Sequence, residues 1–413
     1  MNLEYFIAKR LITGKEHKIS ISAPIIKIAI AAIAISIIMM LIAIATSMGL
    51  QFKIQEKVAA FNGHIQIQNY DGNTSDVSVE PVLLNKEFYP NLSKIEGVSH
   101  IQGVAVKAGI IRTEETFEGI LAKGVNENYN WQFFEEFLTE GRLPNFSEDL
   151  NEEVLISKIQ AGKLQLELGD SFLAVFLKDG DLTKTPNNRK FKIVGIYESG
   201  FEELDTSYIF VDIRHIQRMN KWKANEFGNF EVFLDDFSEI NEKTVEIYNK
   251  TPSNLDTQNI KSKYFKIFEW LELFDFNTAL IIGIMIIVGG INMITALLVL
   301  ILERTQMIGV LKALGTQDWS IRKVFLYNAA YLIGIGLFWG NVIGLGIIFL
   351  QDKFRFLTFP NPEEYYIKYI PVQIDFGNIL LLNLGVMVLC LLMLLIPSYA
   401  VAKISPVKAI KFD

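Results

Sequence analysis

Four long apolar runs dominate the pattern of hydrophobic and polar positions along the chain. They cover residues 25–48, 276–302, 325–350 and 378–402, and the middle of each run carries no charge. A helix needs about 20 apolar residues to cross the hydrocarbon layer of a membrane, where its backbone must satisfy its hydrogen bonds internally. The pattern therefore predicts four transmembrane helices. The first run exceeds the core of a signal peptide, about 7–15 residues, so we expect it to be retained.

The segment between the first two runs, residues 49–275, has a different pattern. Many of its short stretches alternate between apolar and polar residues, with the period of a half-buried strand. Strands are expected at residues 64–68, 104–112, 117–123, 171–176, 190–197, 207–211 and 230–234, and helices at residues 152–163 and 214–222. This mixture predicts an α+β domain outside the membrane.

Both ends of this domain continue the helical pattern of the neighbouring membrane runs. Apolar residues keep a helical period up to Phe61, and Gly63 ends the pattern. Residues 254–274 form an amphipathic pattern that enters the second run without a glycine or proline. The first two membrane helices are therefore expected to project as stalks that carry the domain. Such stalks either transmit motion across the bilayer or serve as tethers.

The distribution of charge predicts the orientation in the membrane. Residues 49–275 contain 24 basic and 37 acidic side chains, while basic residues elsewhere cluster in segments 1–24, 303–324 and 403–413. Short cytoplasmic segments of membrane proteins are the ones rich in Lys and Arg. We therefore expect these three segments in the cytoplasm. The domain and the 351–377 loop then lie on the opposite side.

The sequence lacks the motifs of several enzyme classes. It contains no G-x-x-x-x-G-K-[ST] loop, so the chain is not expected to hydrolyse ATP. The H-E-x-x-H and G-x-S-x-G motifs are also absent. Its single cysteine, Cys390, lies within the fourth apolar run, and its four histidines have no metal-ligand spacing. We expect no catalytic residue, no metal site and no nucleic-acid partner.

The loop at residues 303–324 contains a short amphipathic helix. Ile308, Leu311 and Leu314 form an apolar stripe, and Gly315 has the position of a helix C-terminal cap. The stripe needs a surface to cover it. A groove on a soluble partner or the lipid headgroups would serve equally well.

The sequence of this loop, Glu-Arg-x-x-x-Ile-Gly-Val-Leu-Lys-Ala-Leu-Gly at residues 303–315, resembles the coupling segment of FtsX-like permeases. The ending Ile-Pro-Ser-Tyr-Ala-Val-Ala-Lys-Ile-Ser-Pro at residues 396–406 and the Gly-Arg-Leu-Pro at residues 141–144 are similar to that family too. The resemblance implies a MacB-like periplasmic core domain, a cytoplasmic ABC ATPase dimer that holds ATP and Mg²⁺, and a second permease subunit. This chain itself would bind no cofactor. The residues implied in ATPase coupling are Glu303, Arg304, Met307, Ile308, Gly309, Val310, Leu311, Lys312, Leu314 and Gly315.

Other segments resemble the lipoprotein-releasing branch of this family. They include residues 8–11, 47–52, 189–197 and 365–372. This resemblance implies release of lipoproteins from the inner membrane to a periplasmic carrier. Two alternatives remain within the wider family. One is efflux through an outer-membrane partner, and the other is signalling that activates an envelope hydrolase without transport.

In the lipoprotein-releasing branch, a protruding hairpin binds the carrier. The corresponding hairpin here spans residues 178–189, is shorter and lacks an apolar tip. Its candidate carrier-binding residues are Asp179, Gly180, Thr185, Pro186, Asn187, Asn188 and Arg189. The alternative is an ordinary surface hairpin.

Small and polar residues within the apolar runs suggest two further features. Gly336, Gly340 and Gly344 are spaced four residues apart, which allows two helices to approach closely, so we expect them to pack helices together. Asn292 is expected to find a partner within the bundle. The family resemblance also implies a cavity for membrane lipid and acyl chains, and its candidate lining residues are Ile44, Met48 and Phe52. These three residues could instead pack against a second subunit.

Overall fold

The computed structural model describes residues 3–13, 23–70, 76–84, 92, 94–113, 116–146, 150–177, 186–360, 367 and 369–405. The chain divides into two compact units. The helical unit contains residues 1–52, 270–357 and 369–413, and the sheet unit contains residues 53–269 and 358–368. The boundaries between the units fall within helices α2 (Ala23–Asn62) and α10 (Phe265–Glu303), so each of these helices contributes residues to both units.

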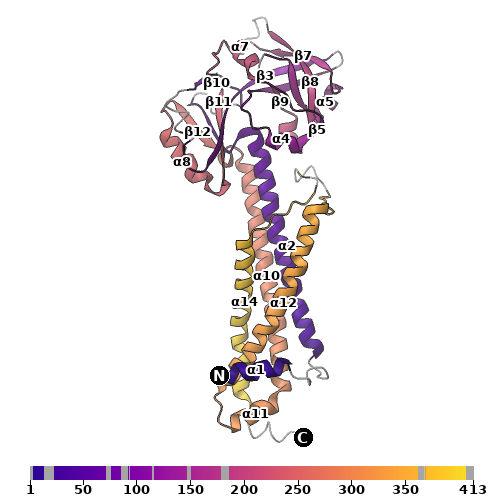
Figure 1. Ribbon diagram of the computed structural model, residues 1–413, viewed down its shortest axis with the longest axis vertical. Coiled ribbons are helices and arrows are strands. Elements are labelled where there is room, and N and C mark those ends of the chain that lie inside the picture. Colours follow the sequence, from indigo (N-terminus) through magenta and orange to yellow (C-terminus); the bar gives the residue numbers. More distant parts are fainter. Residues whose placement is uncertain are drawn as a thin grey trace. The chain divides into compact units, whose positions relative to one another are not determined.

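The helical unit is built around four long helices, which lie side by side (Figure 1). They are α2, α10, α12 (Asp318–Phe354) and α14 (Phe376–Ser398), and each is long and apolar enough to cross a membrane. Within its described residues the unit also contains three shorter elements: α1 (Leu3–Thr13), α11 (Thr305–Ala313) and the 3₁₀ helix η4 (Tyr399–Lys403). With a rise of 1.5 Å per residue, α2 is about 60 Å long, roughly twice the hydrocarbon thickness.

Glycines on α12 bring this helix close to α2. A Cβ atom added at Gly336 would lie 2.7 Å from Ile33, and one added at Gly340 would lie 2.7 Å from Ile37. A Cβ at Gly344 would lie 2.9 Å from Leu41. These distances are too short for a real side chain. The three glycines thus occupy the packing position that their spacing predicts.

A pair of asparagines joins α12 to α14 within the apolar bundle. The Asn341 amide donates to Asn383 Oδ1 at 2.6 Å, and the Asn383 amide donates back to Asn341 Oδ1 at 3.0 Å. A reciprocal pair of this kind satisfies polar groups that lipid cannot. Asn292, for which the sequence predicts a partner in the bundle, shows no side-chain hydrogen bond to any residue that the structure describes.

The sheet unit contains a closed ring of six hydrogen-bonded strands. In ring order these are β3 (Val98–Arg112), β4 (Phe117–Val125), β9 (Tyr208–Asp212), β6 (Glu153–Ser157), β8 (Asn187–Tyr197) and β7 (Ser171–Phe176), which pairs with β3 again. The strand β5 (Leu138–Gly141) is added to β8, while β11 (Asn229–Leu234), β1 (Ile65–Asn69) and β12 (Leu255–Asn259) extend the sheet from β3. The short strands β2 (Val82–Leu83) and β10 (Glu226–Phe227) form a separate pair.

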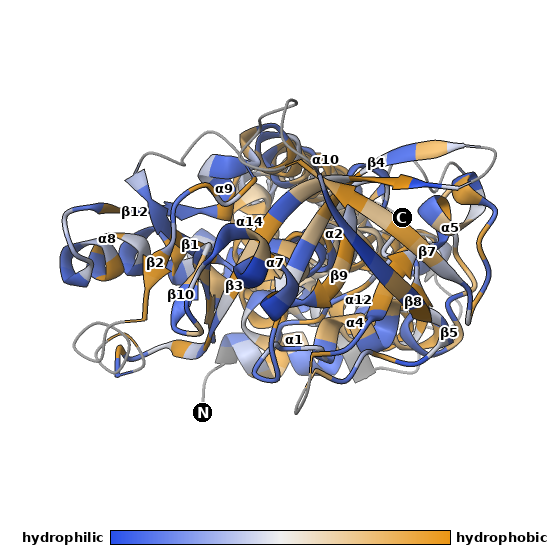
Figure 2. Cartoon of the chain, turned by 90° about the horizontal axis from the view of Figure 1, so that it is seen from above, coloured by the Kyte–Doolittle hydropathy of each residue, from blue (hydrophilic) through white to orange (hydrophobic). Residues whose placement is uncertain are grey.

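Short helices connect or cover these strands. They are α4 (Gln132–Phe137), α5 (Lys158–Leu164), α6 (Glu202–Asp205), α7 (Ile213–Asn220), η3 (Phe237–Glu239), α8 (Ile240–Lys250) and α9 (Ile260–Lys263). Exposed and buried residues alternate along β7, and Figure 2 shows both hydrophilic and hydrophobic residues on the strands and on α8. This pattern agrees with the α+β architecture predicted from the sequence.

An aromatic core fills the sheet unit and includes the end of α2. Phe61, in the last turn of α2, is fully buried and lies 5.3 Å from Phe134 between ring centroids. The Phe134 ring in turn lies 4.6 Å from Phe210, and Tyr197 contacts all three rings. Gly63 then reverses the chain with a φ of 65°, as its position in the sequence predicts.

Two predicted helices were wrong over part of their length. Residues 153–157 of the predicted 152–163 helix form β6, which lies between β8 and β9, and only residues 158–164 are helical. Residues 255–259 of the predicted 254–274 helix form β12, which pairs with β1. Short apolar runs fit a buried strand as well as a helix, and pairing with distant strands decides between them.

Candidate functional site

The short helix α11 is the segment predicted to couple to an ATPase, and its apolar stripe does not form a single exposed face. Ile308 is completely buried in the core of the helical unit, and Gly309 is buried beside it. Val310 and Leu314 are 49% and 77% exposed. The prediction that Ile308 and Leu314 share one uncovered stripe was therefore wrong, because the chain covers Ile308 itself.

Lys312 fixes α11 to the neighbouring ends of the bundle. Its ammonium group donates to the carbonyl oxygens of Ala402 at 3.1 Å and Ile404 at 3.0 Å. It also forms an ion pair with Asp318 Oδ1 at 2.9 Å. Lys312 therefore links α11 to η4 and to the first turn of α12.

The other predicted coupling residues lie close to Lys312 along the chain. Glu303 is the last residue of α10, Arg304 is the N-cap of α11, and Met307 and Leu311 are half-buried against the core. Gly315 has a φ of 87° and ends the segment. The face that remains accessible centres on Val310 and Leu314, with Gln306 and Ala313 beside them.

A groove of 410 Å³ lies between α2, α10 and α14 within the helical unit. Two of the three predicted cavity residues, Ile44 and Met48, line it. Phe52 is not part of its wall and is 47% exposed. The remaining lining residues are Ser47, Asp275, Thr278, Ile282, Ile286, Asn378, Leu381, Leu382, Gly385 and Val386. The contribution of α14 was not predicted, since nothing in the sequence places residues 378–386 beside residue 44.

Polar contacts hold the helices together at one end of this groove. Gln51 Nε2 donates to Asp275 Oδ1 at 2.7 Å, which ties α2 to α10. Asn378 Nδ2 lies 3.3 Å from the sulfur of Met48, which ties α14 to α2. The Ser47 hydroxyl is buried in this region and has no hydrogen-bond partner among the residues that the structure describes. The groove therefore has a polar end and an apolar remainder.

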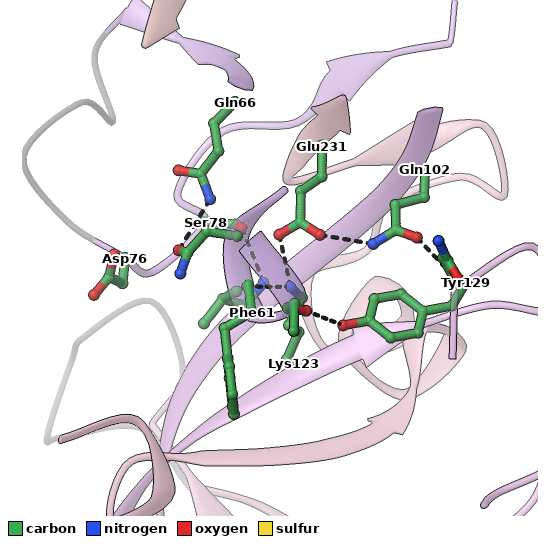
Figure 3. A network of polar contacts seen from close by, with 12 residues as sticks. Phe61, Gln66, Asp76, Ser78, Gln102, Lys123, Tyr129 and Glu231 are labelled. Carbon is green, nitrogen blue, oxygen red and sulfur yellow. Dashed lines mark hydrogen bonds and ion pairs between the residues drawn. The ribbon is translucent and has the colours of Figure 1, made fainter. Parts of the chain in front are cut away.

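A buried ion pair holds the end of α2 inside the sheet unit (Figure 3). Lys123 Nζ, on β4, lies 2.6 Å from Glu231 Oε1 and 2.6 Å from the carbonyl oxygen of Phe61. The other Glu231 oxygen accepts from Gln102 at 2.8 Å, and the Tyr129 hydroxyl donates to Ala60 O at 3.1 Å. Burial lowers the pKa of Lys123, and the charge of Glu231 opposes that shift. The network satisfies carbonyls that the last turn of a helix leaves free.

A second contact fixes α2 one turn earlier. Lys57 Nζ donates to the carbonyl oxygen of Ser199. The adjacent Asp205 carboxylate accepts from the Ser199 hydroxyl at 2.6 Å and from the Gly200 amide at 3.1 Å. Burial raises the pKa of Asp205 to about 6, although these hydrogen bonds act in the opposite direction. Two polar clusters thus attach α2 to the sheet unit.

Most of the predicted carrier-binding hairpin lies outside the described residues, including Asp179, Gly180 and Thr185. Pro186 is described, and Asn187, Asn188 and Arg189 begin β8 and pair with β7.

Beside these hairpin residues, four exposed apolar side chains lie on the outer surface of the ring. They are Ile110, Phe117, Leu173 and Leu177. This surface could not be predicted from the sequence, because apolar residues that point outward from a strand have the same pattern as core positions.

Among the residues that the structure describes, no three His, Cys, Asp or Glu side chains gather as metal ligands.

Two family profiles match the sequence. The FtsX-like permease C-terminal profile matches residues 279–406, and the MacB-like periplasmic core domain matches residues 28–262, more than half of the chain. The chain belongs to the FtsX-like permeases with a MacB-like periplasmic core domain. This permease is thus a subunit of an ABC system, and the family implies a partner ATPase and a paired permease.

Several curated relatives are lipoprotein-releasing permeases, and another is the ABC transporter permease YtrF of Bacillus subtilis, which is 27% identical over 42% of this chain. The permease is 21% identical to the lipoprotein-releasing system transmembrane protein LolE of Haemophilus influenzae, over 99% of both chains. It is 23% identical to LolC of the same organism, over 70% of this chain and 69% of LolC. A solved structure of the periplasmic region of MacB from Actinobacillus actinomycetemcomitans covers 49% of this chain and 91% of its own, with 16% identity and a TM-score of 0.34. The similarity to LolC and LolE and the four apolar helices indicate an inner-membrane protein.

Proposed function

We propose that this permease releases lipoproteins from the inner membrane to a periplasmic carrier, with energy from ATP hydrolysis on a partner ATPase dimer. The observation that carries the proposal is the groove between α2, α10 and α14. Most of its wall is apolar, and two of its three helices, α2 and α10, also contribute residues to the sheet unit. The full-length similarity to LolE supports the same function. Each buried methylene of an acyl chain contributes about 0.8 kcal/mol to membrane anchoring, so extraction of several chains requires external work.

In the proposed mechanism, the ATPase dimer binds the accessible face of α11. Val310 and Leu314 provide apolar contacts there. Since Lys312 links α11 to η4 and α12, a push on α11 moves the base of the bundle as one body. The continuous helices α2 and α10 then carry the displacement to the sheet unit, where Lys123 and Lys57 hold the end of α2.

The exposed apolar residues on the ring are the proposed contact for the carrier. Arg112 lies opposite Phe117 on β4 and opposite Leu173 on β7, so the three side chains share one face. Phe117 is 72% exposed. An apolar surface with a basic side chain in its centre suits a partner that presents both apolar and acidic groups. Residues 186–189 of the hairpin adjoin β7 at its other edge.

The test is reconstitution of the permease with its partner subunits in liposomes that contain an acylated lipoprotein. The expected result is ATP-dependent transfer of the lipoprotein to a soluble carrier, with no transfer of a non-acylated version. Transfer that does not depend on acylation would contradict the proposal. ATP-driven export of a small hydrophobic compound would instead support efflux, and activation of an envelope hydrolase without any transfer would support signalling.

A further inference from the structure

The two ends of the groove in the helical unit differ in chemistry. Ile282, Ile286, Leu382 and Val386 line its interior with aliphatic surface. Its other end is lined by Ser47, Asp275, Thr278 and Asn378. An amphiphile with one apolar tail and a polar head matches this division.

Ser47 indicates that the polar end is incomplete without a ligand. Its side chain is 6% exposed, and its hydroxyl has no hydrogen-bond partner among the described residues. The neighbouring Thr46 hydroxyl, in contrast, donates to Ile42 O at 2.8 Å. An unsatisfied buried hydroxyl is unfavourable, because burial removes its bonds to water. An ester or amide carbonyl of a ligand in the groove would accept this hydrogen bond.

The remaining groups at the polar end favour a positively charged head. The Asp275 carboxylate accepts one bond from Gln51, which leaves its second oxygen for a ligand. The Asn378 amide nitrogen is directed at Met48, so its oxygen remains as an acceptor. Among the described residues that line the groove, none is Lys or Arg. Acceptors and a negative charge without a basic neighbour select a group that donates N–H bonds and carries positive charge.

The size of the groove limits how much of a lipid enters it. A water-sized group occupies roughly 30 Å³, so 410 Å³ holds about 14 such groups. One acyl chain fills this volume, and the other chains of the same lipid remain in the bilayer.

We propose that the groove binds a single acyl chain of a lipid whose head carries an ammonium group, with this ammonium at Asp275 and a chain carbonyl at Ser47. The inference rests on the proposed function, in which this groove accommodates the acylated substrate. Two lipids share this chemistry. One is a phospholipid with an ethanolamine head, and the other is a diacylated lipoprotein with a free N-terminal amine.

Equilibrium binding to the purified full-length permease in detergent, without ATP, tests this proposal. The probes are fluorescent phosphatidylethanolamine, its N-acetylated form, and a diacylglyceryl-cysteine peptide with a free or an acylated amine. We expect the free amine to improve binding about tenfold for at least one of the two lipids, as for one charge-assisted hydrogen bond. The lipid that shows this preference identifies the source. Equal binding of free and blocked amines in both pairs would overturn the proposal.

Two variants and two matched controls locate the site. Asp275→Asn is expected to abolish the preference for the free amine, whereas Asp352→Asn, an exposed carboxylate on α12, leaves it unchanged. Gly385→Phe is expected to weaken binding of all probes, because a Cβ at Gly385 meets no atom within 4 Å and the ring can enter the groove. Gly346→Phe, equally free of neighbours, is its control.

The outcomes separate this inference from the proposed function. Normal binding by both groove variants would overturn the inference, even if the reconstituted system releases lipoproteins. Selective binding without any ATP-driven release would overturn the proposed function and leave the lipid site established.

Discussion

The ammonium group of Lys123 lies 2.6 Å from the main-chain carbonyl oxygen of Phe61, so a strand of the sheet unit caps the end of α2. A positive charge at a helix C-terminus is favourable, because the helix dipole is negative there. Glu231 balances this charge within the protein interior. The junction between α2 and the sheet unit is therefore ionic as well as apolar.

This junction predicts a large effect from a single substitution. Lys123→Met leaves the Glu231 carboxylate buried without its partner, which is expected to lower the free energy of unfolding by about 3–5 kcal/mol. The double variant Lys123→Met, Glu231→Leu removes both charges and is expected to recover most of that loss. Thermal unfolding of the full chain in detergent measures both effects. The exposed pair of Lys158 and Glu198 is the control, and Lys158→Met is expected to change stability by less than about 0.5 kcal/mol.

The burial of Ile308 separates folding from ATPase binding on α11. Leu314→Glu alters an exposed side chain, so it is expected to leave the permease folded but to weaken copurification of the ATPase about tenfold. Ile308→Asp places a carboxylate in the core and is expected to reduce the yield of folded permease itself. Undiminished copurification with Leu314→Glu would exclude this face of α11 as the ATPase contact.

The close approach of α12 to α2 predicts a difference between two glycines of the same helix. Gly340→Leu forces a side chain against Ile37 and is expected to destabilise the bundle by about 1–3 kcal/mol or more. Gly334→Leu is the matched control, since a Cβ at this position meets no atom within 4 Å. The melting temperatures of the two variants in the same detergent give the comparison. Equal values would show that helix packing does not depend on Gly340.

The raised pKa of Asp205, about 6, predicts a specific pH dependence. The folded protein binds a proton at Asp205 more readily than the unfolded chain does, since the ordinary pKa of this group is 3.8. This residue therefore favours unfolding above pH 6, and its unfavourable contribution disappears as the pH falls from about 6 to about 4. Melting temperatures of the wild type and Asp205→Asn across this range test the prediction. The stability of the wild type relative to the variant should rise on acidification, and a constant difference would contradict it.

The membrane helices could be predicted from sequence because a long uncharged apolar run has only one stable structure in lipid. Local chemistry also predicted the turn at Gly63 and the packing role of Gly340. Residues 153–157 and 255–259 were misread, because strand pairing with distant residues overrides their local pattern. The groove depends on α14 meeting α2, and the junction depends on Lys123 meeting Glu231, 108 residues further along the chain. No local sequence pattern indicates either of these two contacts between distant parts of the chain.

The closed ring of strands has a mechanical consequence for the end of α2. Lys123 belongs to β4, and β4 is hydrogen-bonded on both sides, to β3 and to β9. A force on the last turn of α2 that reaches β4 through Lys123 therefore meets no free strand edge at which hydrogen bonds could break one at a time. The Lys123 contact is therefore made by a strand that is held along both of its edges.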